Sequence, residues 1–99
     1  MKTIGVILRE LREEKGLLLR QVAAATDLDS TLLSKMECED RLPTKQQLER
    51  LAKFYKQDLN EMMTAWLADK IFKDVVNEKM ALRAMKLVEE KIKDSTLKH

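Results

Sequence analysis

The sequence predicts an all-α protein of five to six helices, and three observations lead to that expectation. Only two glycines and one proline, the residue types that most disfavour helices, occur among 99 residues. The best helix formers, Ala, Leu, Glu, Lys, Arg, Gln and Met, dominate the composition. Apolar residues recur at intervals of three and four, beginning with Ile4, Ile7, Leu8 and Leu11, and this spacing is typical of amphipathic helices.

The first half of the chain predicts three helices joined by short turns. Thr3 is a good N-cap for the apolar residues that follow it, and Gly16 is a natural C-terminal stop. A short second helix is expected over residues 19–26, because Leu19, Val22, Ala23 and Thr26 share one face. Asp29 then N-caps a third helix from Ser30 to about Glu37.

The second half predicts three more helices after an interruption at Leu42–Pro43. Thr44 and Gln47 form a capping box at the start of a fourth helix. Asp58 is expected to begin a long fifth helix, and Asn77 is expected to cap a sixth. The polar segment 94–99 is expected to fray.

The composition narrows the classes of function. A single cysteine, Cys38, excludes an internal disulfide framework and favours a reducing, cytoplasmic location. With one histidine, His99, no nucleophile–base pair or metal cluster is expected, so we expect no enzyme, no metal and no cofactor. We expect no membrane association, because no apolar run approaches the roughly 20 residues that span a bilayer. A net charge of +2 does not by itself indicate nucleic-acid binding. Any such prediction must rest on where the basic residues lie in the fold.

One segment carries a specific pattern. Within Leu17–Thr44, Ala23 is a small residue where two helices would cross, Leu28 is an apolar turn residue, and Pro43 opens the next helix. Residues 33–37 read Leu-Ser-Lys-Met-Glu. This segment resembles the phage-repressor-like (Xre-type) helix-turn-helix family, and the resemblance extends over residues 4–63. It implies a DNA-binding domain in which the third helix is the recognition helix.

The resemblance also implies roles for individual residues. The start of the third helix would read bases in the major groove, with Ser30, Thr31, Leu32 and Lys35. Phosphates would be contacted by Arg20, Arg41, Thr44 and Lys45. Arg12 and Glu37 stand where the family places a partly buried ion pair. Taken singly, each of these basic residues is more often an ordinary solvated surface charge, and the assignment rests on their joint position around one helix. Leu32 is equally consistent with a partly exposed helix residue.

The sequence departs from the family at three points. Asp27 replaces the turn glycine, and aspartate is tolerated in the left-handed backbone conformation better than most residues are. Leu18–Leu19 replaces the cap of the second helix and the glutamine that follows it. Glu39 replaces a glycine, and the acidic run 37–40 argues against tight DNA binding.

The chain is expected to divide into a helix-turn-helix domain (1–63), a helical extension (64–93) and the frayed tail (94–99). Apolar residues beyond those needed for one packing face suggest dimerisation through the extension, at Phe72, Val76, Met80, Ala84 and Leu87. A helical hairpin that enlarges a monomeric core is the alternative.

We therefore expect a transcriptional regulator that binds double-stranded DNA sequence-specifically, as a homodimer on a two-fold operator. A restriction–modification controller or an antitoxin-type autoregulator would suit the size. The alternative is a protein-interaction module that no longer reads DNA.

Overall fold

A computed structural model shows six helices, and the structure describes residues 1–97. The helices are α1 (Ile4–Glu14), α2 (Leu19–Thr26), α3 (Ser30–Glu37), α4 (Lys45–Tyr55), α5 (Leu59–Val75) and α6 (Ala81–Leu97). No strand occurs in this described part, so the all-α prediction is confirmed. None of these six helices is long and apolar enough to cross a membrane.

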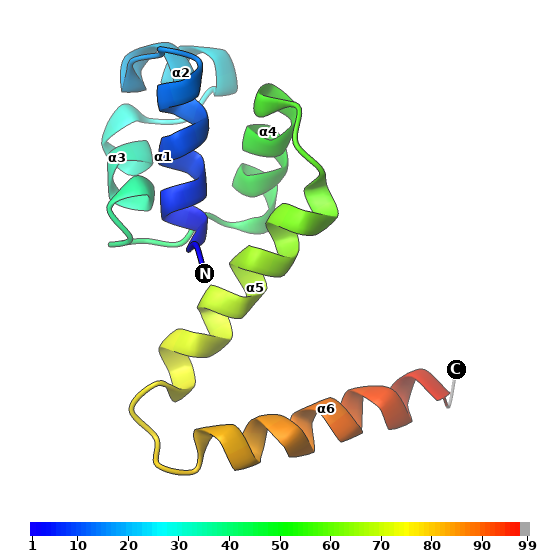
Figure 1. Cartoon of the computed structure of the whole chain (residues 1–99). Coiled ribbons are helices and arrows are strands. Elements are labelled where there is room, and N and C mark those ends of the chain that lie inside the picture. The colour runs from blue at the N-terminus through cyan, green and yellow to red at the C-terminus, as the bar shows by residue number, and fades with distance from the viewer. Residues whose placement is uncertain (98–99) are drawn as a thin grey trace.

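One core holds the first four helices and the N-terminal part of α5 together. Helix α3 packs on α1 and α2, and α5 packs on α4 and α1. We call this five-helix unit the body (Figure 1). Its buried apolar side chains are Ile4, Leu8, Val22, Leu33, Met36, Leu48, Leu51, Ala52, Tyr55, Met62 and Trp66.

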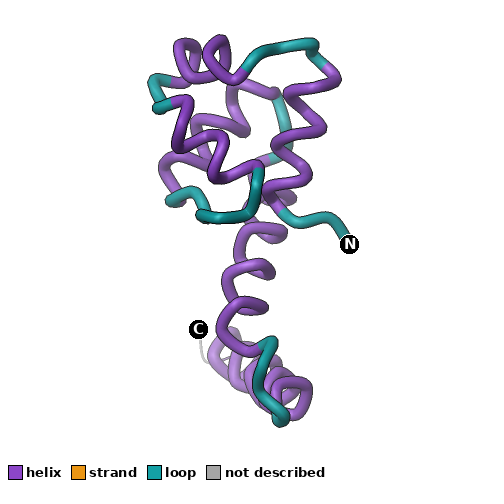
Figure 2. Tube along the Cα trace, turned by 90° about the vertical axis from the view of Figure 1, so that its left-hand side faces the viewer, coloured by secondary structure: helices purple, strands orange, loops and turns teal. Residues whose placement is uncertain are grey.

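The C-terminal part of α5 leaves the body, and α6 lies apart from it. Figures 1 and 2, viewed at right angles, both show α5 projecting away and the chain then turning into α6. The result is an elongated molecule with extents of 44 × 32 × 20 Å.

Local capping chemistry sets the starts of most helices of the body. The Thr3 hydroxyl accepts from the Val6 amide, and the Asp29 carboxylate accepts from the Leu32 amide. Thr44 and Gln47 cap each other reciprocally, as predicted. Helix α2 lacks a capping side chain at Leu18.

The turns require a left-handed backbone at Asp27 (φ 56°), Glu39 (φ 65°) and Gly16 (φ 63°). Asp27 therefore adopts the expected conformation in place of a glycine. Gly5 serves a different purpose, because a Cβ atom there would lie 2.5 Å from the Met36 carbonyl oxygen. The absence of a side chain lets α1 approach α3 closely.

The start of the sixth helix was predicted wrongly. Asn77 lies in a turn and caps nothing, because successive short-range bonds join Glu78 to Val75 and Ala81 to Glu78. The first bond of helical type that leads into α6 runs from Ala84 to Met80. Helix α6 continues to Leu97, into the segment 94–99 expected to fray, and residues 98–99 lie outside the described part.

Candidate nucleic-acid interface

An open groove lies between the start of α2 and the exposed side of α3. It brings together four of the residues predicted to contact DNA: Arg20, Ser30, Thr31 and Lys35. Leu18, Leu19 and Ser34 complete its lining. Two cations and three hydroxyl groups thus line this groove, and no carboxylate among residues 1–97 does. Such a surface offers hydrogen-bond donors to phosphates and to base edges.

Sequence reasoning did not assign Ser34 or Leu18 to this groove. Ser34 lies one turn after Ser30 on α3, so helical periodicity already placed the two on one face. Leu18 is 49% exposed. Its amide donates to the Gln21 side chain at 2.8 Å, which is half of a capping box.

The other predicted contact residues lie outside the groove. Leu32 is partly buried and packs against the core. Arg41 lines a separate pocket with Thr3 and Asp69. Lys45 lines another pocket, beside Trp66.

The amide and the hydroxyl of Thr44 both form hydrogen bonds that cap α4. Its amide donates to Gln47 Oε1 at 2.9 Å, and its hydroxyl accepts from the Gln47 amide at 3.2 Å. The first-turn amides of Lys45 and Gln46 have no partner within the helix, as in any α-helix. These amides, rather than Thr44 itself, are the donors that this end of α4 offers to an anion.

Arg12 and Glu37 form a largely buried ion pair that joins α1 to α3. Arg12 Nε lies 2.9 and 3.1 Å from the two carboxylate oxygens of Glu37, and Nη2 lies 2.9 Å from Oε1. The side chains are only 17% and 8% exposed. Hydrogen bonding to Glu37 raises the pKa of Arg12 above its ordinary value.

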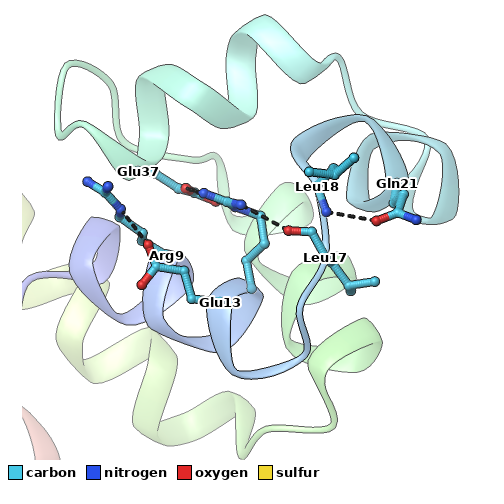
Figure 3. A network of polar contacts seen from close by, with 7 residues as sticks. Arg9, Glu13, Leu17, Leu18, Gln21 and Glu37 are labelled. Carbon is cyan, nitrogen blue, oxygen red and sulfur yellow. Dashed lines mark hydrogen bonds and ion pairs between the residues drawn. The ribbon is translucent and has the colours of Figure 1, made fainter.

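The same arginine also holds the chain that leads into α2. Arg12 Nη1 donates to the Leu17 carbonyl oxygen at 2.9 Å. Figure 3 shows the Glu37 side chain and the Leu17 carbonyl, which are the two partners of this guanidinium. One side chain therefore positions both walls of the groove, namely α3 and the entry to α2.

The acidic run at the end of α3, residues 37–40, does not line the groove. The Glu37 carboxylate is paired with Arg12 and is largely buried. Glu39 lines the pocket at the start of α1, beside Thr3 and Gly5. The acidic run therefore presents only Glu39 and Asp40 as exposed carboxylates, at the end of α3.

A second unusual surface lies on α5 and α6. The expected dimerisation residues are exposed: Phe72 (61%), Val76 (48%), Met80 (55%), Ala84 and Leu87 (59%). On the side of α6 that shares pockets with α5, Leu82 is 82% exposed and Ile92 is 60% exposed, while Ala81 and Met85 are half-buried. Helix α6 thus carries apolar side chains on two faces, and the described chain covers them only in part.

Residues 3–64 match the sequence family described as a helix-turn-helix domain. The matched segment covers α1 to α4 and the beginning of α5, and it contains the whole groove. No curated protein sequence matches the chain.

Proposed function

The chain belongs to the helix-turn-helix domain family, and from that premise we propose that it is a sequence-specific transcriptional regulator that binds a two-fold DNA operator as a homodimer. The family is in general one of DNA-binding regulators. The observation that carries the proposal for this chain is the groove between α2 and α3. It gathers Arg20, Ser30, Thr31 and Lys35 on one surface without a carboxylate.

The groove suits duplex DNA in its chemistry. Hydroxyl groups of Ser30 and Thr31 bond to several base edges, and the Lys35 ammonium favours the O6 and N7 atoms of guanine. Arg20, at the entry to α2, lines the same groove, where it would neutralise a phosphate. Because Leu32 packs against the core, its share in base reading would be limited to its exposed part.

The exposed apolar faces of α5 and α6 support the homodimer. A helix with two apolar faces needs two neighbours, and within the described part of the chain α6 meets α5 only in part, at the half-buried Ala81 and Met85. A second copy would cover both faces, if its α5 and α6 pack against the first pair around a two-fold axis as a four-helix bundle. The two recognition helices would then lie about 34 Å apart, one turn of DNA. The narrower form of this proposal is an autoregulator of the restriction–modification controller or antitoxin type.

Two lysine variants test the assigned DNA contacts, one in the groove and one outside it. Lys35→Ala should relax the preference at particular base pairs, at a cost of about 1–3 kcal/mol. Lys45→Ala, in the phosphate-contacting set, should weaken binding to all sequences alike and flatten its salt dependence. Lys53→Ala, which removes an exposed charge at the far end of α4, is the matched control. If Lys35→Ala leaves affinity and sequence preference intact, α3 does not read bases through this face.

One observation favours a second function, a protein-interaction module. An exposed leucine, Leu18, stands in the groove where a polar cap would be expected, and the carboxylates of Glu39 and Asp40, which follow α3, are exposed. Salt dependence separates the two functions. Binding to random duplex DNA should weaken with salt, with a logarithmic slope of about −0.9 per phosphate contacted. Absence of retention on DNA even at low salt would favour the interaction module.

A further inference from the structure

Helix α5 is tied to the body by two side chains one turn apart. Trp66 Nε1 donates to the Pro43 carbonyl oxygen at 2.7 Å, and this contact is buried. Asp69 Oδ2 accepts from the Ile4 amide at 2.7 Å. We call Trp66 and Asp69 the anchor. Neither residue lies in the groove that is proposed to read DNA.

Each of the two anchor bonds joins α5 to a segment that is directly connected to, or packed against, the recognition helix α3. Pro43 lies in the connection that leaves α3, directly before Thr44 caps α4. Ile4 is the first residue of α1, which contacts α3 closely at Gly5 and through the Arg12–Glu37 pair. The direction of α5 is therefore fixed relative to α3 from two separate elements.

Beyond the anchor, α5 becomes exposed. Phe72, three residues after Asp69, is 61% exposed, whereas Trp66, three residues before it, is 6% exposed. The helix is continuous across this boundary, from Leu59 to Val75. A continuous helix transmits its direction, so the anchor is the last point at which the body controls the direction of the exposed C-terminal part of α5.

We propose that Trp66 and Asp69 are positioning residues that set the orientation of the two reading surfaces in the dimer, and hence the half-site spacing that the dimer accepts. This inference rests on the proposed function. The molecule is 44 Å long. A change of about 10° in the direction of α5 would therefore move a reading surface by several ångströms, comparable with the rise of about 3.4 Å per base pair. Loss of either tie should broaden the range of orientations without altering the groove.

The single cysteine gives a direct way to measure that orientation. Cys38 is exposed and directly follows α3. A nitroxide attached to Cys38 in each copy of the full-length chain reports the distance between the two recognition helices by pulsed dipolar spectroscopy. The variants are Asp69→Ala and Trp66→Phe, which remove the acceptor and the donor. Asp69→Asn retains an acceptor oxygen, and Asp74→Ala removes an exposed carboxylate further along α5.

We expect one narrow distance distribution for the unchanged chain, for Asp69→Asn and for Asp74→Ala. Asp69→Ala and Trp66→Phe should at least double its width while the protein remains dimeric and helical. Distributions as narrow as that of the unchanged chain in both variants would overturn the inference and leave the proposed dimer standing. Absence of dipolar coupling in the unchanged chain would overturn the dimer itself, and the inference with it.

Operator spacing gives the corresponding readout on DNA. One base pair is inserted or removed between half-sites of an operator selected by the unchanged chain, and affinity is measured by fluorescence anisotropy. The unchanged chain should lose at least tenfold in affinity on either change. Asp69→Ala and Trp66→Phe should lose threefold or less, while their affinity for a single half-site stays the same. An undiminished penalty for the altered spacing in both variants would contradict a positioning role. A general loss of stability would differ from the expected result, because it would lower the affinities for all operators and for the single half-site together.

Discussion

Removing one member of the Arg12–Glu37 pair should destabilise the fold strongly, because the pair is largely buried. Arg12→Met keeps a long apolar stem but strands Glu37, whose side chain is 8% exposed, without its charged partner. Glu37→Gln keeps the shape and leaves Arg12, which is 17% exposed and still bonded to the Leu17 carbonyl. Breaking a buried pair costs about 3–5 kcal/mol. We therefore expect about 3–5 kcal/mol for Arg12→Met and about 2–3 kcal/mol for Glu37→Gln, since the arginine retains a partner and some water.

A double-mutant cycle measured by denaturant unfolding tests this reasoning. The double variant should cost less than the sum of the two single variants by about 1–3 kcal/mol, because no uncompensated charge is left. The matched control is the Arg9–Glu13 pair of the same helix, which has a similar distance of 3.0 Å but is 60% and 56% exposed. Its coupling should be about 0.3–0.5 kcal/mol. Equal coupling in the two pairs, or strict additivity at Arg12 and Glu37, would refute the argument.

Three other outcomes are expected. Gly5→Ala should lower the free energy of unfolding by about 1–2 kcal/mol in denaturant melts, because the clash with the Met36 carbonyl outweighs a helix-propensity gain of about 1 kcal/mol; a gain in stability would show that α1 and α3 are not in close contact. Burial, followed by the charge of Glu37, raises the pKa of Tyr55 to about 12. As this is the only tyrosine, the absorbance of tyrosinate should titrate near pH 12. The raised pKa means that the stability contributed by the neutral phenol is complete below pH about 10 and is lost as the pH rises through 12. A titration midpoint near pH 10, or the same alkaline loss of stability in Tyr55→Phe, would contradict this. Deleting residues 77–99 should leave a helical monomer, or an aggregating protein, with greatly reduced operator affinity, and a truncated chain that stays dimeric in light scattering would contradict dimerisation through α6.

The sequence was most informative where a structural decision is local. A cap depends on one side chain and an amide two or three residues away, so Thr3, Asp29, Thr44 and Asp58 correctly marked four helix starts. The groove residues Arg20, Ser30, Thr31 and Lys35 came together because a short turn fixes the relation between α2 and α3. Their contacts with DNA remain predictions.

The sequence was less informative about contacts between residues far apart in the chain and about which side chains face the core. Asp69 bonds to an amide 65 residues away in sequence, and nothing in its own helix distinguishes it from an exposed carboxylate. Leu32 and Leu33 are adjacent, and only the packing shows that both contact the core to different extents. Asn77 has the right chemistry for a cap, but the chain makes two further short-range turns before α6 begins.

The central claim, that a dimer reads DNA through α3, is tested most directly by selecting duplexes from a random pool with the purified full-length chain. Sequencing the bound DNA should reveal a two-fold motif whose half-sites lie about one helical turn apart, roughly 10 base pairs. The same selection with Lys35→Ala should lose the preference at one symmetric pair of positions and keep the spacing. No enriched motif, or a motif without two-fold symmetry that Lys35→Ala leaves unchanged, would contradict the account.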